Sequence, residues 1–129
     1  MSLAEELVGA GIAPAAALVI PNGTVTAVTA TSSSTTLTAT VLRSGVNRVT
    51  GSDGVKLPAM NPGSSVIVIN DTGSSIKVWP SAGGAIQVPG TSFGSAVADA
   101  AYTQTLYSTV QYTCVVGGSA ALFCVLKSA

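Results

Sequence analysis

Few residues in this chain could perform acid-base, nucleophilic or metal chemistry. The chain has no histidine, which removes the usual general base, a common metal ligand and the partner of a serine or cysteine nucleophile. The aspartates Asp53, Asp71 and Asp99 formally allow a two-carboxylate glycosidase. Each lies in turn or loop sequence, where side-chain hydrogen bonds to the turn explain an aspartate. We therefore expect no enzymatic activity, no catalytic residue and no phosphate-binding loop.

The two cysteines, Cys114 and Cys124, lack the spacing and the histidines of a zinc site. They flank the stretch VVGGSAALF, so a hairpin could bring them near each other. Two buried thiols are the simpler interpretation, and a disulfide is the alternative, because the facing residues depend on the loop length. No metal or cofactor is expected.

The chain carries little charge for its 129 residues, because only 8% of them are charged while 47% are apolar. Typical soluble domains have roughly 25% charged residues. Five basic and five acidic residues cancel, so no basic field attracts phosphate backbones, and we expect no nucleic-acid partner. In one chain of this size, the free energy gained by burying apolar surface only marginally balances the conformational entropy lost on folding. Further burial between copies of the chain is therefore expected.

Residues 1–21 are predicted to form a short N-terminal helical arm. Ser2 and Glu5 match a capping box, and glycines end the helix after one or two turns. The apolar stretch that follows is short and interrupted by Pro14, so neither a signal peptide nor a membrane span is expected. Such a short helix is marginal alone, so its apolar side chains should dock on this domain, a neighbouring copy or a larger partner. These side chains are Leu3, Leu7, Val8 and Ile12.

Residues 22–129 are predicted to form one all-β domain, a sandwich-like or jelly-roll-like antiparallel fold. The stretches TVTAVTA (24–30) and TTLTATVL (35–42) alternate with period two, which is typical of antiparallel strands with one solvated face. No internal repeat is visible, so neither a solenoid nor a long fibre shaft is expected. Turn signals bound further strands and a closing hairpin. These strands are expected at 46–50, 55–57, 66–70, 76–79 and 85–88, the hairpin at 106–116 and 120–127, and a helical turn at 96–101.

Aromatic and basic side chains suggest two kinds of binding site. Sugar rings stack on exposed aromatics, and the candidates for a glycan site are Trp79, Tyr102, Tyr107 and Tyr112. Trp79 ends an apolar strand just before Pro80, however, and this position fits core packing better. Arg43 and Arg48 bracket the stretch SGVN and could pair with acidic groups of a partner, the alternative being a solvated loop.

Two stretches together resemble the capsid decoration (cement) and head-fibre-like proteins of tailed bacteriophages. The opening AEELVGAGIAPAAALVI (4–20) resembles the short helical leader of small virion proteins in that group. Residues 45–88 resemble the group's β domain, whereas the C-terminal third departs from its pattern. The matching positions are Gly54, Val55, Leu57, Pro58, Gly63, Val68, Asn70, Val78, Pro80, Gly83, Gly84 and Ile86.

The resemblance implies a homotrimer in the virion, bound on the outer capsid surface after synthesis in the host cytoplasm. Its partners would be other copies of itself and the major capsid protein, with no membrane involved. The alternative is a receptor- or glycan-binding module of a head fibre or tail fibre, and a bacterial carbohydrate-binding module is a rival from another class. The residues expected to contact partners are Leu3, Leu7, Val8, Ile12, Arg43 and Arg48.

Overall fold

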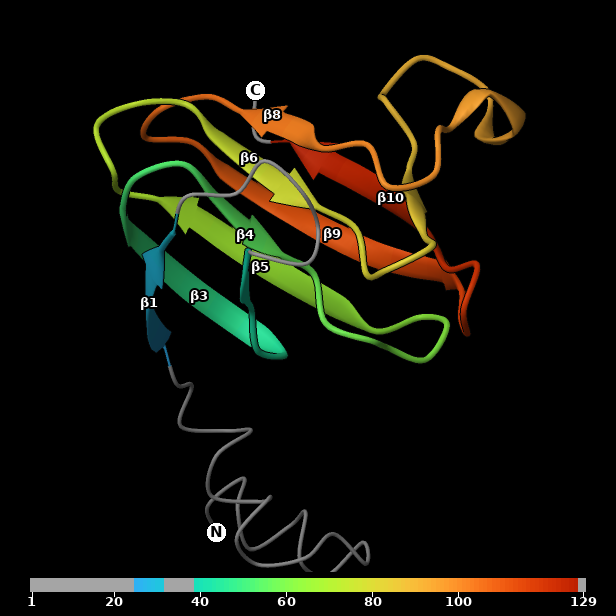
Figure 1. Ribbon diagram of the computed structural model, residues 1–129, viewed down its shortest axis with the longest axis horizontal. Coiled ribbons are helices and arrows are strands. Elements are labelled where there is room, and N and C mark those ends of the chain that lie inside the picture. Colours follow the sequence, from blue (N-terminus) through green and yellow to red (C-terminus); the bar gives the residue numbers. More distant parts are fainter. Residues whose placement is uncertain (1–24, 32–38, 128–129) are drawn as a thin grey trace, which may run out of the picture.

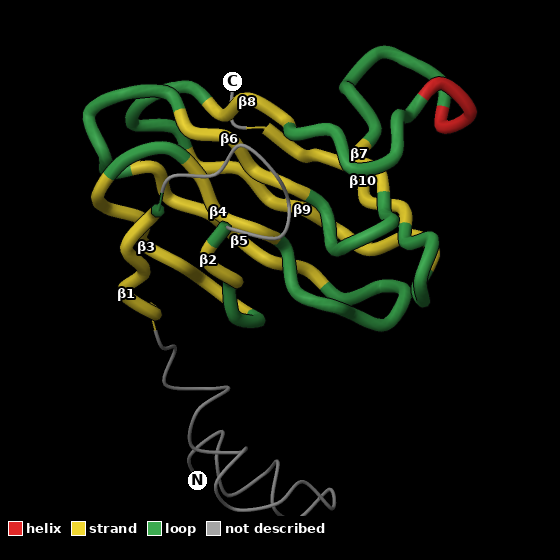
Figure 2. The backbone as a smooth tube through the Cα atoms, in the orientation of Figure 1, coloured by secondary structure: helices red, strands yellow, loops and turns green. Residues whose placement is uncertain are grey.

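The computed structural model describes residues 25–31 and 39–127, which are almost entirely strands and turns (Figures 1 and 2). The predicted helical arm at 1–21 lies outside the described residues, as does half of the strand expected at 35–42. The strands are β1 (Val25–Ala30), β2 (Thr40–Val41), β3 (Gly45–Gly51), β4 (Gly54–Lys56), β5 (Ser65–Asn70), β6 (Ile76–Trp79), β7 (Ala85–Ile86), β8 (Tyr102–Gln104), β9 (Thr109–Val116) and β10 (Leu122–Lys127).

These strands form two sheets, a six-stranded sheet in the order β1-β3-β5-β9-β10-β7 and a four-stranded sheet in the order β2-β4-β6-β8. The chain alternates between the two sheets from β1 to β6, so that β1, β3 and β5 are parallel neighbours. The strands β2, β4 and β6 are parallel neighbours in the other sheet. Val25 pairs with Val46 and Val46 with Ile67, a shift of 21 residues each time. The strands β1, β3 and β5 therefore follow one another at a constant interval, although their sequence shows no repeat.

The prediction of an all-β fold is confirmed, but the antiparallel order is wrong for the first six strands. Antiparallel ladders join β9 to β5 and β10, and β8 to β6, so both sheets are mixed. The expectation rested on alternating side chains. Alternation reports that one face of a strand is buried and says nothing about the direction of the neighbouring strand.

The connection from β7 to β8 also differs from its prediction. The expected helical turn at 96–101 is wrong, because a 3-10 turn, η1, occupies Phe93–Ser95 instead. The backbone N–H of Asp99 donates to the carbonyl oxygen of Gly84 at 2.8 Å, and Ala98 bridges to Ala85. This pairing beside β7 holds the alanine-rich stretch extended, so tertiary contacts override its helix propensity.

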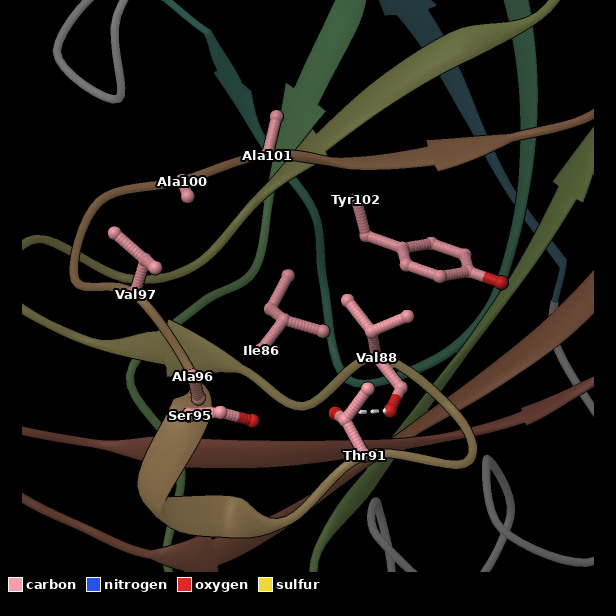
Figure 3. A pocket seen from close by; sticks show the side chains of 9 residues that line it. All are labelled: Ile86, Val88, Thr91, Ser95, Ala96, Val97, Ala100, Ala101 and Tyr102. Carbon is pink, nitrogen blue, oxygen red and sulfur yellow. Dashed lines mark hydrogen bonds between the residues drawn. The ribbon is translucent and has the colours of Figure 1, made fainter.

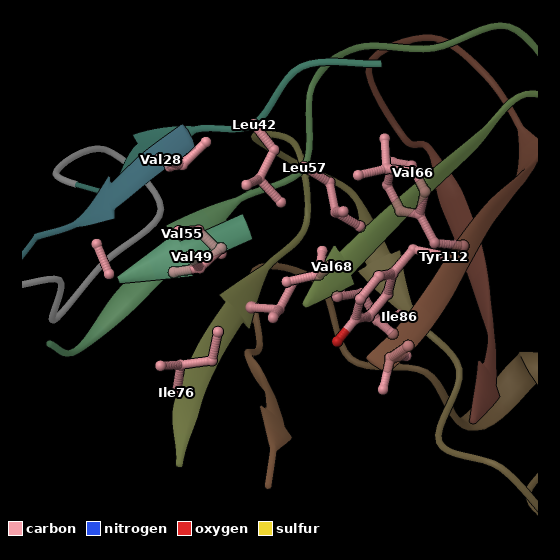
Figure 4. Packing of buried hydrophobic residues seen from close by; sticks show 14 of the residues in the cluster. Val28, Leu42, Val49, Val55, Leu57, Val66, Val68, Ile76, Ile86 and Tyr112 are labelled. Atoms are coloured by element: carbon pink, nitrogen blue, oxygen red, sulfur yellow. The ribbon is translucent and has the colours of Figure 1, made fainter. Parts of the chain in front are cut away.

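One hydrophobic cluster contains side chains from both sheets (Figure 4). In β5 the even-numbered residues Val66, Val68 and Asn70 are buried, whereas the odd-numbered ones are partly exposed. Burial of each large apolar side chain contributes about 1.5–3 kcal/mol. The fully enclosed members of the cluster include Val49, Val55, Leu57, Val66, Val68, Val78, Tyr112 and Phe123.

Candidate functional site

The three aspartates serve the fold rather than a shared site. Asp71 accepts a hydrogen bond from the Nε of Arg48 at 2.8 Å, and Asp99 Oδ1 accepts one from the backbone N–H of Gly83 at 2.8 Å. Asp53 has a φ of 78°, a left-handed conformation that aspartate tolerates better than most residues. No group of three or more metal-ligating side chains occurs within residues 25–31 and 39–127.

The two arginines predicted to contact a partner occupy different environments. The Arg48 guanidinium forms an exposed ion pair with Asp71 of its own chain, so an acidic partner would have to compete with it. Arg43 is exposed, and its backbone is held on both sides by the Asn47 side chain. Its N–H donates to Asn47 Oδ1 at 3.1 Å, and its carbonyl oxygen accepts from Asn47 Nδ2 at 2.8 Å. The loop thus presents the Arg43 side chain from a fixed backbone.

The predicted contact residues of the arm, Leu3, Leu7, Val8 and Ile12, lie outside the described residues. The fold therefore locates only the surfaces of the β domain that an arm or another partner could reach.

The outer face of the six-stranded sheet carries a row of four apolar residues and one glutamine that crosses five strands. Strand registers place its members at one level, each pairing with the next. Their neighbours in sequence, such as Val66 and Tyr112, point into the core, so the members of the row point away from it. We call this set the outer row: Val25, Val46, Ile67, Gln111 and Leu126.

The outer row remains accessible to another molecule. Val25 and Leu126 are 57% and 66% exposed, and the three residues between them are partly exposed. Ile69 extends the apolar surface along β5, and Cys124 extends it along β10. An apolar sheet face of this kind usually packs against another element or partner.

A second candidate is an apolar pocket of about 330 Å³ beneath the loop that joins β7 to β8. Ile86, Val88 and Tyr102 point toward it in Figure 3, together with Val97 of the loop. The loop is anchored at its base, where the Gln87 N–H donates to the carbonyl oxygen of Phe123 at 2.9 Å. The pocket is at the small end of the range for ligand sites.

The Thr91 and Ser95 hydroxyls of this pocket are hydrogen-bonded within the loop itself. Thr91 Oγ1 donates to the carbonyl oxygen of Val88 at 2.7 Å, and Ser95 Oγ donates to that of Ser92 at 2.8 Å. No charged residue lines the pocket. It can therefore receive an apolar side chain or a small apolar molecule, but it offers no group for catalysis.

The aromatic candidates divide between core and surface. Trp79 is only 9% exposed, which confirms its interpretation as a core residue and leaves its ring unavailable for stacking on a sugar. Tyr102 packs edge-to-face on buried Tyr112, with 6.1 Å between ring centroids. Tyr107 is 71% exposed and Phe93 is 44% exposed, so Tyr107 is the most exposed aromatic residue of the described region.

The cysteines lie on adjacent strands but on opposite faces of the six-stranded sheet. Cys114 pairs in register with buried Phe123 and is itself buried, whereas Cys124 pairs with Thr113 on the outer face. Both thiols are free. The register therefore shows that Cys114 and Cys124 do not face each other across the hairpin, and it favours two thiols over a disulfide.

Sequence reasoning missed both the outer row and the pocket. The sequence does contain an indication of the outer row, because the stretch SVIVIN in β5 is apolar on both faces. The pocket left a weaker one, the occurrence of Val88 and Val97 in a connection otherwise rich in glycine and small residues.

Comparison of the chain with protein-family models, with curated proteins and with solved structures finds no match. In the part of the chain that the structure describes, no helix is long and apolar enough to cross a membrane.

Proposed function

We propose that this chain is a structural, non-enzymatic bacteriophage protein, a homotrimeric decoration protein that binds the outer capsid surface and stabilises the shell. The observation that carries the proposal is the outer row, an accessible set of four apolar residues and one glutamine outside the core of a chain with few charged groups. The resemblance of residues 4–20 and 45–88 to phage decoration and head-fibre-like proteins directs the proposal to the virion.

The proposed mechanism needs no reactive group. Trimerisation buries apolar β surface that one copy leaves accessible. The trimer then bridges neighbouring major capsid proteins, and because it binds the assembled shell and not the separated subunits, it stabilises the shell by mass action. Three copies on one axis convert weak contacts with the shell into firm attachment. No cofactor, metal or nucleic acid takes part.

For the architecture, we propose that the two sheets pack face to face as a sandwich-like domain. The cluster that joins Val49 and Tyr112 of one sheet to Val55 and Val78 of the other supports this arrangement. The parallel ladders among β1, β3 and β5 make it different from a jelly roll, which is antiparallel throughout.

The alternative function, a glycan- or receptor-binding module of a phage fibre, rests on Tyr107. It is the most exposed aromatic residue among those described, at 71% against 44% for Phe93, whereas Trp79 is buried. A glycan-array screen of the wild type and of Tyr107→Ala tests this alternative. Binding that is lost in Tyr107→Ala would favour the fibre module over the decoration protein.

Two measurements test the proposed function. Light scattering should give three times the mass of the chain in solution. Phage particles that lack the protein should release DNA at a lower temperature than complete particles, and added protein should restore the difference. A stable monomer that binds neither procapsids nor expanded heads would contradict the proposal.

A further inference from the structure

The outer row has dimensions that suit a short helix. Neighbouring strands lie about 4.8 Å apart, so the five residues of the row span about 19 Å from β1 to β10. An α-helix rises about 1.5 Å per residue, so the predicted helix of one or two turns covers about 5–11 Å of that width. The row can accommodate one such helix lying across the strands.

The chain supplies a segment of matching length and character ahead of β1. Residues 3–12 place Leu3 and Leu7 on one face of the predicted helix, with Glu6 beside that face and Glu5 opposite. The outer row is apolar, and Arg43 stands three residues before its member Val46 on a fixed loop. An arm docked on the row would thus place Leu3 and Leu7 against its apolar side chains. The Glu6 carboxylate would then lie toward the Arg43 guanidinium.

We propose that residues 3–12 of one copy dock across the outer row of a neighbouring copy, so that exchanged arms close the trimer. The inference rests on the proposed homotrimer and names its interface. Each copy gives an arm and receives one, which is a head-to-tail contact that closes when three copies form a ring.

The linker between the arm and β1 is long enough to reach a neighbouring copy. The row begins at Val25, which is also the first residue of β1. Twelve residues separate Ile12 from Val25, and extended they reach about 40 Å, twice the width of the row. A linker of this reach can carry residues 3–12 to the row of another copy, and the proposed homotrimer places such a copy beside each chain.

Cys124 provides a built-in probe for the docked arm. It lies on the outer face, two residues along β10 from Leu126 of the row, which is about 7 Å. In the full-length variant Leu7→Cys, mild oxidation with diamide removes two hydrogens from a pair of thiols and links them if they meet. We expect Cys124 to link to the new cysteine of the next copy and to produce covalent trimers that dithiothreitol reverses.

Two variants serve as controls for this experiment. Glu5→Cys places the thiol on the opposite face of the predicted helix, so its yield of covalent trimer should be at least fivefold lower. Leu7→Cys combined with Cys124→Ser should lose the linked trimer altogether. Peptide mapping of the linked product must find the arm peptide joined to the β10 peptide.

The oligomeric state tests the same interface without any new thiol. Leu126→Asp should raise the dissociation constant of the trimer at least about tenfold, because it places a charge under the arm. Val97→Asp changes a residue of equal exposure, 65% against 66%, on the loop over the pocket, and should leave the trimer unchanged.

The outcomes separate this inference from the proposed function. A disulfide within one chain would place the arm on its own sheet and overturn the exchange. A trimer by light scattering that gives no arm-to-β10 link, or that Leu126→Asp leaves intact, would also overturn it while the proposed function stands. A monomeric wild type would overturn both.

Discussion

The hydroxyl of Tyr112 donates a hydrogen bond to Gln104 Oε1 at 2.9 Å inside the core. Gln104 Nε2 in turn donates to the carbonyl oxygens of Val68 at 2.8 Å and Ser108 at 3.0 Å. This chain of bonds joins β8 of the four-stranded sheet to β5 and β9 of the six-stranded sheet. Because Tyr112 and Gln104 are both buried, each depends on the other for a polar partner that water cannot replace.

Tyr112→Phe should lower the free energy of unfolding by about 1–3 kcal/mol. The substitution preserves the ring and leaves Gln104 Oε1 buried without its donor. Urea denaturation followed by circular dichroism measures the loss. Tyr107→Phe, at a site that is 71% exposed, is the control and should change stability by less than about 0.5 kcal/mol. Equal effects in the two variants would show that the buried hydrogen bond is not stabilising.

Stability should fall at alkaline pH because of the same tyrosine. Burial raises the pKa of Tyr112 far above its ordinary value, and the nearby Tyr102 raises it further. In the unfolded chain the group loses its proton near pH 10, whereas in the folded chain it keeps it. The contribution of this tyrosine to the free energy of unfolding is therefore complete below about pH 10. Above that pH it declines by about 1.4 kcal/mol per pH unit.

Unfolding free energies of the wild type and of Tyr112→Phe between pH 9 and pH 11.5 check this prediction. The wild type should lose stability more steeply above pH 10, since the variant lacks the ionising group. The two proteins differ only in this hydroxyl, so the difference between their two curves measures its contribution to stability. Parallel curves would contradict the role assigned to Tyr112.

The positions of the strands follow from the sequence, but their order does not. The alternating pattern places β6 at 76–79, where the structure has it, and β3 within one residue of its bounds at each end. The direction of β3 against β5 depends on the path of the chain between sheets. Val46 could face outward equally well in a parallel or an antiparallel ladder, so no local pattern decides between them.

The candidate surfaces were predictable only in part for a related reason. The stretch SVIVIN shows that both faces of β5 are apolar, so an outer contact could have been expected at Ile67. That Ile67 shares a level with Val25 and Leu126 depends on registers between residues far apart in the sequence. The buried role of Gln104 is equally long-range, since its partners lie on β5 and β9.

The turn between β3 and β4 should not tolerate a side chain at Gly51. Its φ of 87° is left-handed, and an added Cβ would lie 2.9 Å from the carbonyl oxygen of Ala30. Gly45 has a φ of 90° and open space around its Cβ position. Alanine at this position therefore measures the cost of the left-handed backbone alone, without a steric clash. We expect Gly45→Ala to cost about 1–2 kcal/mol and Gly51→Ala distinctly more, measured by urea denaturation. Equal losses would mean that the backbone at Gly51 moves away freely.

The two thiols should differ in reactivity because they face opposite sides of one sheet. Burial raises the pKa of the Cys114 thiol, and its Sγ lies 3.3 Å from the carbonyl oxygen of Val116. The thiolate is the reactive form, so Cys114 should react with a disulfide reagent only when the domain opens, whereas Cys124 reacts from the surface. Under denaturing conditions without reductant, both thiols should titrate, since neither is in a disulfide. The variant Cys114→Ser should lose the slow phase of the reaction, and Cys124→Ser should lose the fast phase. A faster reaction at Cys114 than at Cys124 would contradict the register of β9 and β10.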